Sequence, residues 1–168
     1  MKTDLFKKVQ LIIFDFDGVF TDNRVITNQD GSESVSCWRS DGIGLSRISK
    51  LGIKLIIVST ETNPVVSIRS AKLNIPCFQA VEDKSIVVKE ICKKFGIQKE
   101  NTMFVGNDIN DIPAFKEVGL PVCVADSYPE IYPYVVYKTN TNGGLGAVRE
   151  ICDLIFNSLM QKNSQNGQ

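Results

Sequence analysis

An α/β fold with a mainly parallel central sheet is the fold class that this sequence of 168 residues predicts. Short, β-branched apolar runs alternate with stretches of helical periodicity, which is typical of strands joined by crossover helices. The runs are almost continuously apolar, as expected for strands buried on both faces of a parallel sheet. The length is about that of one domain, so we expect a single core.

Four apolar runs predict the strands of this sheet. They are Val9–Phe14, Ile53–Val58, Thr102–Val105 and Pro121–Ala125. Four periodic stretches predict the helices, and two of them stop at a glycine, which is a common signal for the end of a helix. The predicted helices are Gly42–Leu51, Asn63–Leu73, Ser85–Phe95 and Ile112–Val118.

One segment, from Arg24 to Trp38, departs from this alternation. Two strand-like runs flank Asp30-Gly31, a dipeptide that strongly favours a hairpin turn. We therefore expect a β-hairpin flap over about residues 24–38, directly after the first strand. The single domain is expected to span residues 1–160, and the polar residues 161–168 are expected to form a disordered tail.

The composition excludes several kinds of chemistry and of partner. The sequence contains no histidine, so it cannot support Ser-His-Asp or Cys-His catalysis or histidine metal ligation. Its 19 basic and 19 acidic residues give a net charge of zero, which disfavours binding to nucleic acid or to an anionic membrane. The five cysteines form no CxxC pair, and no secretory or membrane-spanning run is evident, so we expect reduced thiols in the cytoplasm.

Polar and acidic residues follow three of the predicted strands. In doubly wound folds, ligands bind outside the carboxyl ends of the strands. Asp-x-Asp-Gly follows the first strand, Ser-Thr-Glu the second and Gly-Asn-Asp-Ile-Asn-Asp the third, and Lys84 lies at the start of the helix that leads to the third. Several carboxylates at one edge need a compensating positive charge, which Mg²⁺ and Lys84 would supply. This pattern predicts phosphoryl transfer through an aspartyl-phosphate.

At these residues, over about Leu11 to Phe156, the chain resembles the haloacid dehalogenase-like phosphatases. The resemblance implies a three-layer, Rossmann-like fold and Mg²⁺ as the cofactor. It implies that Asp15 is the nucleophile and Asp17 the general acid and base. It further implies that Lys84 completes the catalytic set and binds the phosphoryl group together with Ser59 and Thr60. The metal ligands that it implies are Asp15, Asp17, Asn107, Asp108 and Asp111.

The absence of a cap insertion narrows the resemblance. The hairpin is too small to form a lid, so the chain resembles the capless subfamily that acts on phosphates of 3-deoxy-2-keto sugar acids. The stretches Ser40–Gly44 and Gly143–Glu150 also resemble signatures of that subfamily. The resemblance implies a homotetramer in which neighbouring subunits complete each active site and exclude water from it.

The loop after the second strand indicates a branch of the subfamily. The octulosonate 8-phosphate phosphatases typically read Ser-Gly-Arg there, whereas the nonulosonate branch has Glu in the last position, as in Ser59-Thr60-Glu61. That branch also carries an Arg and a Lys on the next helix, and Arg is suited to binding a carboxylate. The resemblance thus favours a nonulosonate 9-phosphate as substrate, with octulosonate 8-phosphate next. The substrate-binding residues that it implies are Ser40, Glu61, Arg69 and Lys72.

Two residues depart from the family pattern. Asn107 stands where the family usually has an Asp that ligates Mg²⁺, and Thr60 stands where glycine is common. An amide oxygen contributes no charge, so weaker metal binding is expected. The same Gly-Asn pair is familiar in the phosphatase-like module of CMP-sialic acid synthetases. A weakly active or inactive oligomerisation module therefore remains the alternative, and a phosphotransferase or mutase is a third possibility that a capless site disfavours.

Overall fold

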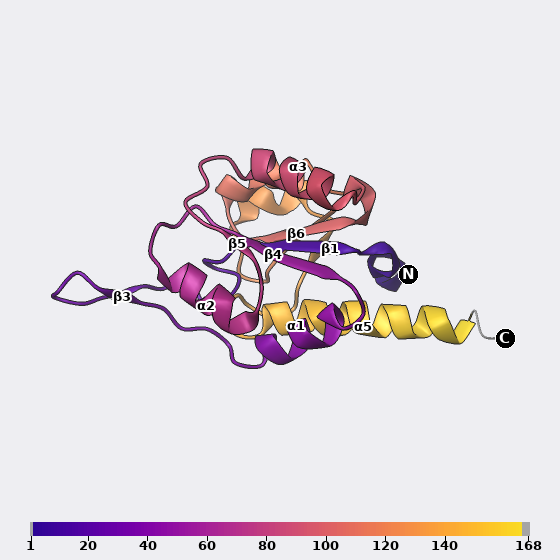
Figure 1. Ribbon diagram of the computed structural model, residues 1–168, viewed down its shortest axis with the longest axis horizontal. Coiled ribbons are helices and arrows are strands. Elements are labelled where there is room, and N and C mark those ends of the chain that lie inside the picture. Colours follow the sequence, from indigo (N-terminus) through magenta and orange to yellow (C-terminus); the bar gives the residue numbers. More distant parts are fainter. Residues whose placement is uncertain (1, 166–168) are drawn as a thin grey trace.

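The computed structural model describes residues 2–165, and its centre is a sheet of six parallel strands (Figure 1). Every neighbouring pair of strands in this sheet is parallel. The strands, in their order across the sheet, are β5 (Cys77–Phe78), β4 (Lys54–Val58), β1 (Leu11–Phe14), β6 (Thr102–Gly106), β7 (Leu120–Cys123) and β8 (Tyr137–Lys138). The predicted parallel α/β fold is confirmed.

Helices cover both faces of the sheet and make the molecule three layers thick (Figure 1). One face is covered by α1 (Asp41–Ser49), α2 (Val65–Leu73) and α5 (Ala147–Gln165). The other face is covered by α3 (Lys84–Phe95) and α4 (Ile112–Phe115). Short 3₁₀ helices complete the chain: η1 (Lys2–Lys8), η2 (Lys99–Asn101), η3 (Ile109–Asp111) and η4 (Pro129–Tyr134).

The central strand β1 separates two hydrophobic cores. Ile12 and Phe14 belong to the core that contains the buried side chains of α1 and α5. Leu11 and Ile13 belong to the core that contains those of α3 and α4. All four side chains are fully buried, because successive side chains of a strand point to opposite faces of the sheet. This burial explains why the run is apolar at every position.

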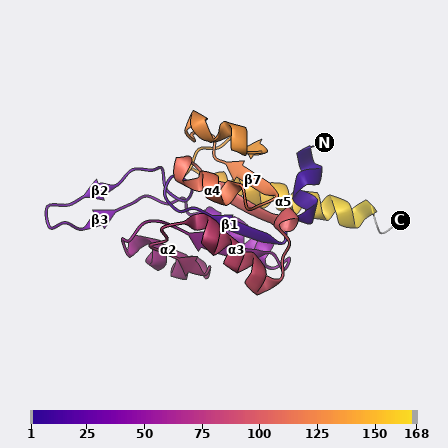
Figure 2. The ribbon, with the colours of Figure 1, turned by 90° about the horizontal axis from the view of Figure 1, so that it is seen from above.

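The predicted hairpin is present but its paired part is short. Only β2 (Ile26–Thr27) and β3 (Glu33–Ser34) pair, in antiparallel register, and an isolated bridge joins Thr21 to Cys37 nearer the sheet. Gly31 has a φ of 82° at the turn, as the Asp30-Gly31 signal predicts. The hairpin projects from the carboxyl edge of the sheet into solvent (Figures 1 and 2).

The C-terminal part of the chain differs from the prediction. Helix α5 runs from Ala147 to Gln165, so the expected tail is helical as far as Gln165, and residues 166–168 lie outside the described residues. Its first turns bury Ala147, Val148 and Ile151 completely. Gln and Lys are good helix formers, and this propensity lets the helix continue beyond its buried part.

The edge strands were also missed by the sequence analysis. Both β5 and β8 contain two residues, which is too short for a recognisable period. No helix among residues 2–165 is long and apolar enough to cross a membrane, and all five cysteines are free thiols. The sheet order places β4, β1 and β6 side by side, so the polar residues that follow these three strands meet at one edge.

Candidate active site

Asp15 follows directly after β1, and its carboxylate is buried at the carboxyl edge of the sheet. Its backbone N–H donates to the carbonyl of Val105 in β6 at 2.8 Å. Its side-chain Oδ1 accepts a hydrogen bond from the N–H of Phe16 at 2.7 Å, and the residue is only 4% exposed. These contacts hold the carboxylate in one orientation, in which Oδ2 has no hydrogen bond to any residue between 2 and 165.

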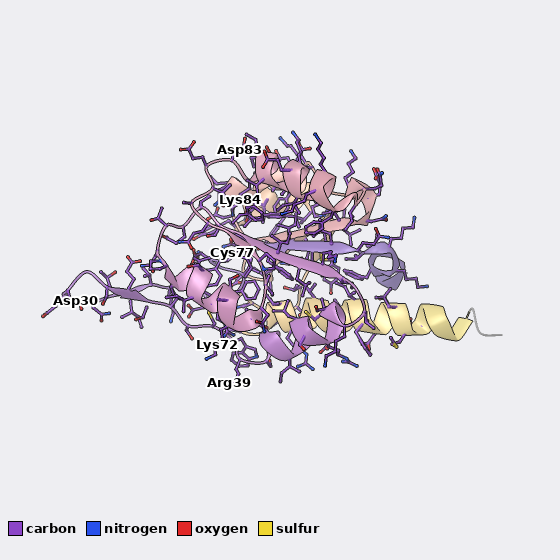
Figure 3. All side chains as sticks on the ribbon, viewed as in Figure 1. Asp30, Arg39, Lys72, Cys77, Asp83 and Lys84 are labelled. Carbon is purple, nitrogen blue, oxygen red and sulfur yellow. The ribbon has the colours of Figure 1, made fainter. Side chains whose placement is uncertain are left out.

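Lys84 lies between two buried carboxylates. It is the first residue of α3, which begins there because the side chain of Asp83 accepts a hydrogen bond from the N–H of Ser85 (Figure 3). Its Nζ is 2.8 Å from Asp15 Oδ1 and 2.7 Å from Asp111 Oδ1. One ammonium group faces two carboxylates, so the three side chains together carry an excess of negative charge when both carboxyl groups are ionised.

Asp111 also organises the loop after β6. Its Oδ2 accepts hydrogen bonds from the N–H groups of Asn107 at 2.8 Å and Asp108 at 3.3 Å. This approach requires a glycine at position 106, because a Cβ on Gly106 would lie 2.2 Å from Asp111 Oδ2. These contacts give Asp111 a positioning role in addition to the metal-ligating role that the family resemblance implies.

Asn107 packs against the turn that carries Asp17. A Cβ on Gly18 would lie 1.9 Å from Asn107 Nδ2, and Gly18 has a φ of 75°, so glycine is needed here for both space and conformation. The Oγ1 of Thr21 accepts a hydrogen bond from the N–H of Gly18 at 3.1 Å and closes the same turn. Thr21 lies four residues after Asp17, and no role was assigned to it from the sequence.

Two glycines near the C-terminus support this turn from behind. A Cβ on Gly143 would lie 1.8 Å from the carbonyl oxygen of Gly18. The N–H of Gly144 donates to the carbonyl of Val19 at 3.0 Å, and the N–H of Gly143 donates to Asp126 Oδ1 at 2.9 Å. The stretch that resembles a subfamily signature therefore serves close backbone packing beneath the loop after β1.

The loop after β4 presents two unpaired donors. Ser59 is buried, and its Oγ accepts a hydrogen bond from the N–H of Glu61 at 3.1 Å, so its O–H remains available to donate. Glu61 Oε1 accepts from the N–H groups of Thr62 at 2.6 Å and Asn63 at 2.8 Å. The N–H of Thr60 has no partner in the described part of the chain. The Ser59 hydroxyl and the Thr60 N–H can therefore donate to an anion.

Burial and charge shift the pKa values of the acidic residues at this edge. Burial raises the pKa of Asp15 to about 7, and the neighbouring Asp111 carboxylate adds to this effect while Lys84 opposes it. Burial and the nearby Glu61 raise the pKa of Asp17. Burial acts to lower the pKa of Lys84, but the two facing carboxylates outweigh it and raise that pKa. Lys84 is therefore an ammonium ion, and Asp17 is suited to holding a proton.

A cleft of about 270 Å³ opens beside Asp17, between the hairpin and the loop after β4. The Oε2 of Glu33 on the hairpin accepts a hydrogen bond from Asn63 Nδ2 at 3.1 Å, which links the two walls of the cleft. Its charged and amide lining residues include Asp17, Arg24, Glu33, Glu61 and Asn63. The cleft provides polar groups next to the position where the loop after β4 can bind an anion.

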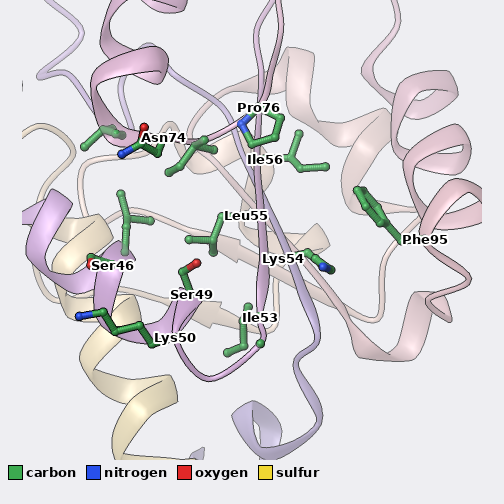
Figure 4. A pocket seen from close by; sticks show the side chains of 14 residues that line it. Ser46, Ser49, Lys50, Ile53, Lys54, Leu55, Ile56, Asn74, Pro76 and Phe95 are labelled. Atoms are coloured by element: carbon green, nitrogen blue, oxygen red, sulfur yellow. The ribbon is translucent and has the colours of Figure 1, made fainter.

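A larger cleft, of about 540 Å³, lies elsewhere (Figure 4). It is lined by residues of α1, by the amino-terminal part of β4 and by the segment after α2. Its lining includes none of the residues that the sequence analysis proposed for catalysis or binding. Convergent polar groups, rather than volume, therefore locate the candidate site.

Asp15, Asp17 and Asn107 carry oxygen atoms of the kind that a hard divalent cation prefers. Asp15 Oδ2, the carboxylate of Asp17 and the amide oxygen of Asn107 make no hydrogen bond within residues 2–165, whereas Asp108 Oδ1 accepts from the N–H of Ile109 at 2.7 Å. No three acidic or thiol side chains stand in metal-binding geometry in the described chain. The five predicted ligands thus do not form one complete set, but Mg²⁺ keeps several waters and needs few protein ligands.

Three residues predicted to bind substrate make no contact with Asp15 in their own chain. Arg69 Nη2 donates to the carbonyl of Trp38 at 3.3 Å. Lys72 is exposed on α2, which lies on the face of the sheet opposite α3 (Figure 3). Ser40 precedes α1 and makes no side-chain capping bond. Within one chain, therefore, the structure does not bring these side chains to Asp15.

Comparisons with known proteins point to one family. The family model described as haloacid dehalogenase-like hydrolase matches residues 59–151. The 3-deoxy-D-manno-octulosonate 8-phosphate phosphatase of Salmonella typhi is 33% identical over 163 residues, which cover 96% of this chain and 87% of the relative.

Solved structures give the same result. The 3-deoxy-D-manno-octulosonate 8-phosphate phosphatase of Yersinia pestis has a TM-score of 0.90 and 31% identity, over 95% of this chain and 86% of that one. The enzyme of the same name from Moraxella catarrhalis, solved with a magnesium ion, a phosphate ion and a KDO molecule, has a TM-score of 0.90 and 29% identity. That match covers 98% of this chain and 95% of that one.

The buried ion pairs of Lys84 predict a pH-dependent loss of stability. Lys84→Met leaves Asp15 and Asp111 without a cation, so we expect it to lower the free energy of unfolding by about 3–5 kcal/mol at pH 7. Lys84 lowers the pKa of Asp15, which burial and Asp111 raise to about 7, so removal of Lys84 raises that pKa further. The loss should therefore be largest at high pH and should shrink as the pH falls towards about 7. Denaturant unfolding of the wild type and the variant at a series of pH values measures this loss in the free energy of unfolding.

Lys89→Met is the matched control on the same helix. Lys89 is 3.1 Å from Glu117 at the surface, and an exposed pair contributes less than about 1 kcal/mol. Equal losses for the two variants at pH 7 would contradict the role of Lys84 described above.

Proposed function

Since this chain belongs to the haloacid dehalogenase-like hydrolases, in the subfamily of the 3-deoxy-D-manno-octulosonate 8-phosphate phosphatases, we propose that it is a phosphatase that uses Mg²⁺. The bond that it hydrolyses is the phosphate monoester of a 3-deoxy-2-keto sugar acid. The observation that carries the proposal is the arrangement of Asp15. Its Oδ1 is held by Lys84 and by the N–H of Phe16, while Oδ2 is left without a hydrogen bond and is available as a nucleophile.

In the first step, Asp15 Oδ2 attacks phosphorus and the bond from phosphorus to the sugar oxygen breaks. The Ser59 hydroxyl, the Thr60 N–H and Lys84 bind the phosphoryl oxygens as charge develops on them. Asp17 gives its proton to the departing sugar oxygen. Burial and Glu61 raise the pKa of Asp17, which is the direction that this step needs. Lys84 opposes the rise in the pKa of Asp15 and so favours the carboxylate form of the nucleophile.

In the second step, Asp17 accepts a proton from a water molecule that attacks the phosphorus of the aspartyl-phosphate. The bond between phosphorus and Asp15 Oδ2 breaks, inorganic phosphate forms and the carboxylate of Asp15 is restored. Because the same residue donates and then accepts the proton, no histidine is needed. The absence of histidine from the sequence is compatible with this mechanism.

Magnesium is the cofactor that the oxygen donors of the site favour. Asp15, the backbone carbonyl of Asp17 and Asn107 would hold it, with Asp108 next to them. A bound Mg²⁺ would neutralise charge on the phosphoryl oxygens. The related enzyme of Moraxella catarrhalis was solved with a magnesium ion and a phosphate ion, which supports the proposal.

Replacement of the nucleophile tests the function directly. We expect Asp15→Asn to lower phosphate release from a sugar-acid phosphate by more than about a thousandfold, because an amide oxygen is a poor nucleophile, while the protein stays folded. Asp83→Asn is the control, since Asn also caps a helix. Release of inorganic phosphate is measured in the presence of Mg²⁺. Wild-type turnover by the Asp15 variant would overturn the assignment of Asp15 as the nucleophile.

The length of the sugar acid is a finer question. The relatives are named for an eight-carbon substrate, but Glu61 stands where such enzymes typically carry an arginine. Glu61 lines the cleft beside Asp17, and its Oε2 makes no hydrogen bond in the described chain. We therefore propose that a nonulosonate 9-phosphate is preferred to octulosonate 8-phosphate.

A ratio of specificity constants tests this preference. We expect a higher kcat/KM for the nonulosonate 9-phosphate, and we expect Glu61→Arg to shift the ratio towards the eight-carbon substrate by about tenfold, the value of one charged hydrogen bond. The ratio cancels any loss of loop order that affects both substrates. Glu82→Arg, at an exposed position, is the control, and a wild-type preference for the eight-carbon substrate would refute the proposal.

We further propose that the chain forms a homotetramer through the face that carries α1 and α2. Exposed apolar side chains are found on these helices, on the hairpin and in the stretch Gly143–Glu150: Val25, Ile26, Trp38, Ile43, Ile68 and Leu145. Burial of such side chains against a neighbouring copy would remove apolar surface from water. Arg69 and Lys72 lie on the same helix as Ile68, so a neighbouring copy could receive them in its site.

A charge placed on this face tests the assembly. Ile68 is 66% exposed on α2 and Ile86 is 54% exposed on α3, on opposite faces of the sheet. We expect Ile68→Glu to reduce the mass measured by sedimentation and to lower activity, whereas Ile86→Glu should change neither. A wild-type monomer would refute the tetramer. A wild-type tetramer that releases no phosphate from either substrate would instead favour an oligomerisation module associated with CMP-sialic acid synthesis.

A further inference from the structure

Gln79 lies outside the motifs that point to the function, yet its side chain contacts the loop that follows β4. Its Nε2 donates to the carbonyl of Asn63 at 2.7 Å. We propose that Gln79 is a positioning residue that fixes the backbone of Ser59–Asn63 for phosphate binding. The inference rests on the proposed phosphatase function, because it assigns the order of that phosphate-binding loop to a residue outside it.

The segment around Gln79 holds the loop at several points. The N–H of Ser59 donates to the carbonyl of Phe78 at 2.9 Å, and the N–H of Val81 donates to the carbonyl of Ser59 at 3.1 Å. The N–H of Ala80 donates to the carbonyl of Glu61 at 3.1 Å. These bonds extend the pairing of β4 and β5 past the ends of both strands, and the side chain of Gln79 adds the last contact, at Asn63.

The conformation of Ala80 indicates that this segment is held firmly. Ala80 has a φ of 56°, in the left-handed region that is unfavourable for a residue with a Cβ. Such conformations persist only where the surroundings determine them, and they gather at functional sites. The bonds from Gln79, Ala80 and Val81 to the loop are the surroundings that do so here.

One N–H of the loop, that of Thr60, has no acceptor among residues 2–165. The N–H groups of Ser59, Glu61, Thr62 and Asn63 all have acceptors within the protein. A loop that slipped at its Asn63 end would no longer hold the Thr60 N–H and the Ser59 hydroxyl in a fixed relation to Lys84, so the affinity for phosphate should fall.

Gln79 also connects the loop to two other parts of the site. Asn63 bonds to Gln79 through its carbonyl and to Glu33 of the hairpin through its Nδ2. In the other direction, the chain runs from Gln79 to Lys84 within five residues. Gln79 thus contacts the loop at Asn63, the residue that the hairpin also contacts.

Three variants separate positioning from a general effect on stability. Gln79→Met keeps the length of the side chain but removes the amide donor. Gln79→Lys returns an N–H donor at a similar reach. Gln10→Met is the control, because Gln10 is exposed, lies at the amino end of β1 and makes no side-chain hydrogen bond in the described chain.

The measurements are the dissociation constant of inorganic phosphate by calorimetry with Mg²⁺ present, kcat and KM on the sugar-acid phosphate, and the melting temperature. We expect Gln79→Met to raise the dissociation constant and KM by about five- to tenfold, the value of one hydrogen bond, with little change in the melting temperature. Gln79→Lys should recover most of this loss, and Gln10→Met should match the wild type.

Two results would overturn the inference. One is an unchanged phosphate affinity in Gln79→Met, with or without a lower melting temperature, because a purely structural role predicts that result. The other is a wild-type protein that binds no phosphate, in which case the proposed function fails as well. If the wild-type protein binds inorganic phosphate and hydrolyses the sugar-acid phosphate, and Gln79→Met does both equally well, only the role of Gln79 is refuted.

Discussion

The contact of one buried ammonium with two buried carboxylates is the interaction on which the rest of the site depends. Lys84 lies 2.8 Å from Asp15 and 2.7 Å from Asp111, and all three residues are at most 4% exposed. Each group comes from a different strand or helix terminus, so the pairing fixes α3 relative to the ends of β1 and β6. Desolvation makes an unpaired charge costly here, and the three elements must therefore be assembled together.

Close backbone approach is the second constraint. Gly18, Gly106 and Gly143 each stand where a Cβ would lie within 2.2 Å of another atom. In each case that atom belongs to the loop after β1 or to a side chain of the loop after β6. The loops can therefore approach each other only because these positions lack side chains, and the charged groups gain their short distances from this packing.

Much of this arrangement could be predicted from the sequence. The continuous apolar runs identify β1, β4, β6 and β7, and the order of the strands brings Asp15, Ser59 and the Asp111 loop to one edge. The two-residue strands β5 and β8 show no period and were missed. The contact between Gln79 and Asn63 joins residues 16 apart, with no motif at either end, and only the folded chain reveals it. The distance of Arg69 and Lys72 from Asp15 likewise depends on the face of the sheet that α2 covers.

The two-residue strands at the borders of the sheet also determine how the molecule can meet other proteins. A long, exposed border strand offers a row of unpaired peptide groups to which another chain can add, and this is a common origin of aggregation. Here β5 and β8 contain two residues each, so such a row is very short at either border. Extension of the sheet from one molecule to the next is therefore disfavoured, and the protein must recognise its neighbours through side chains on its helices and hairpin.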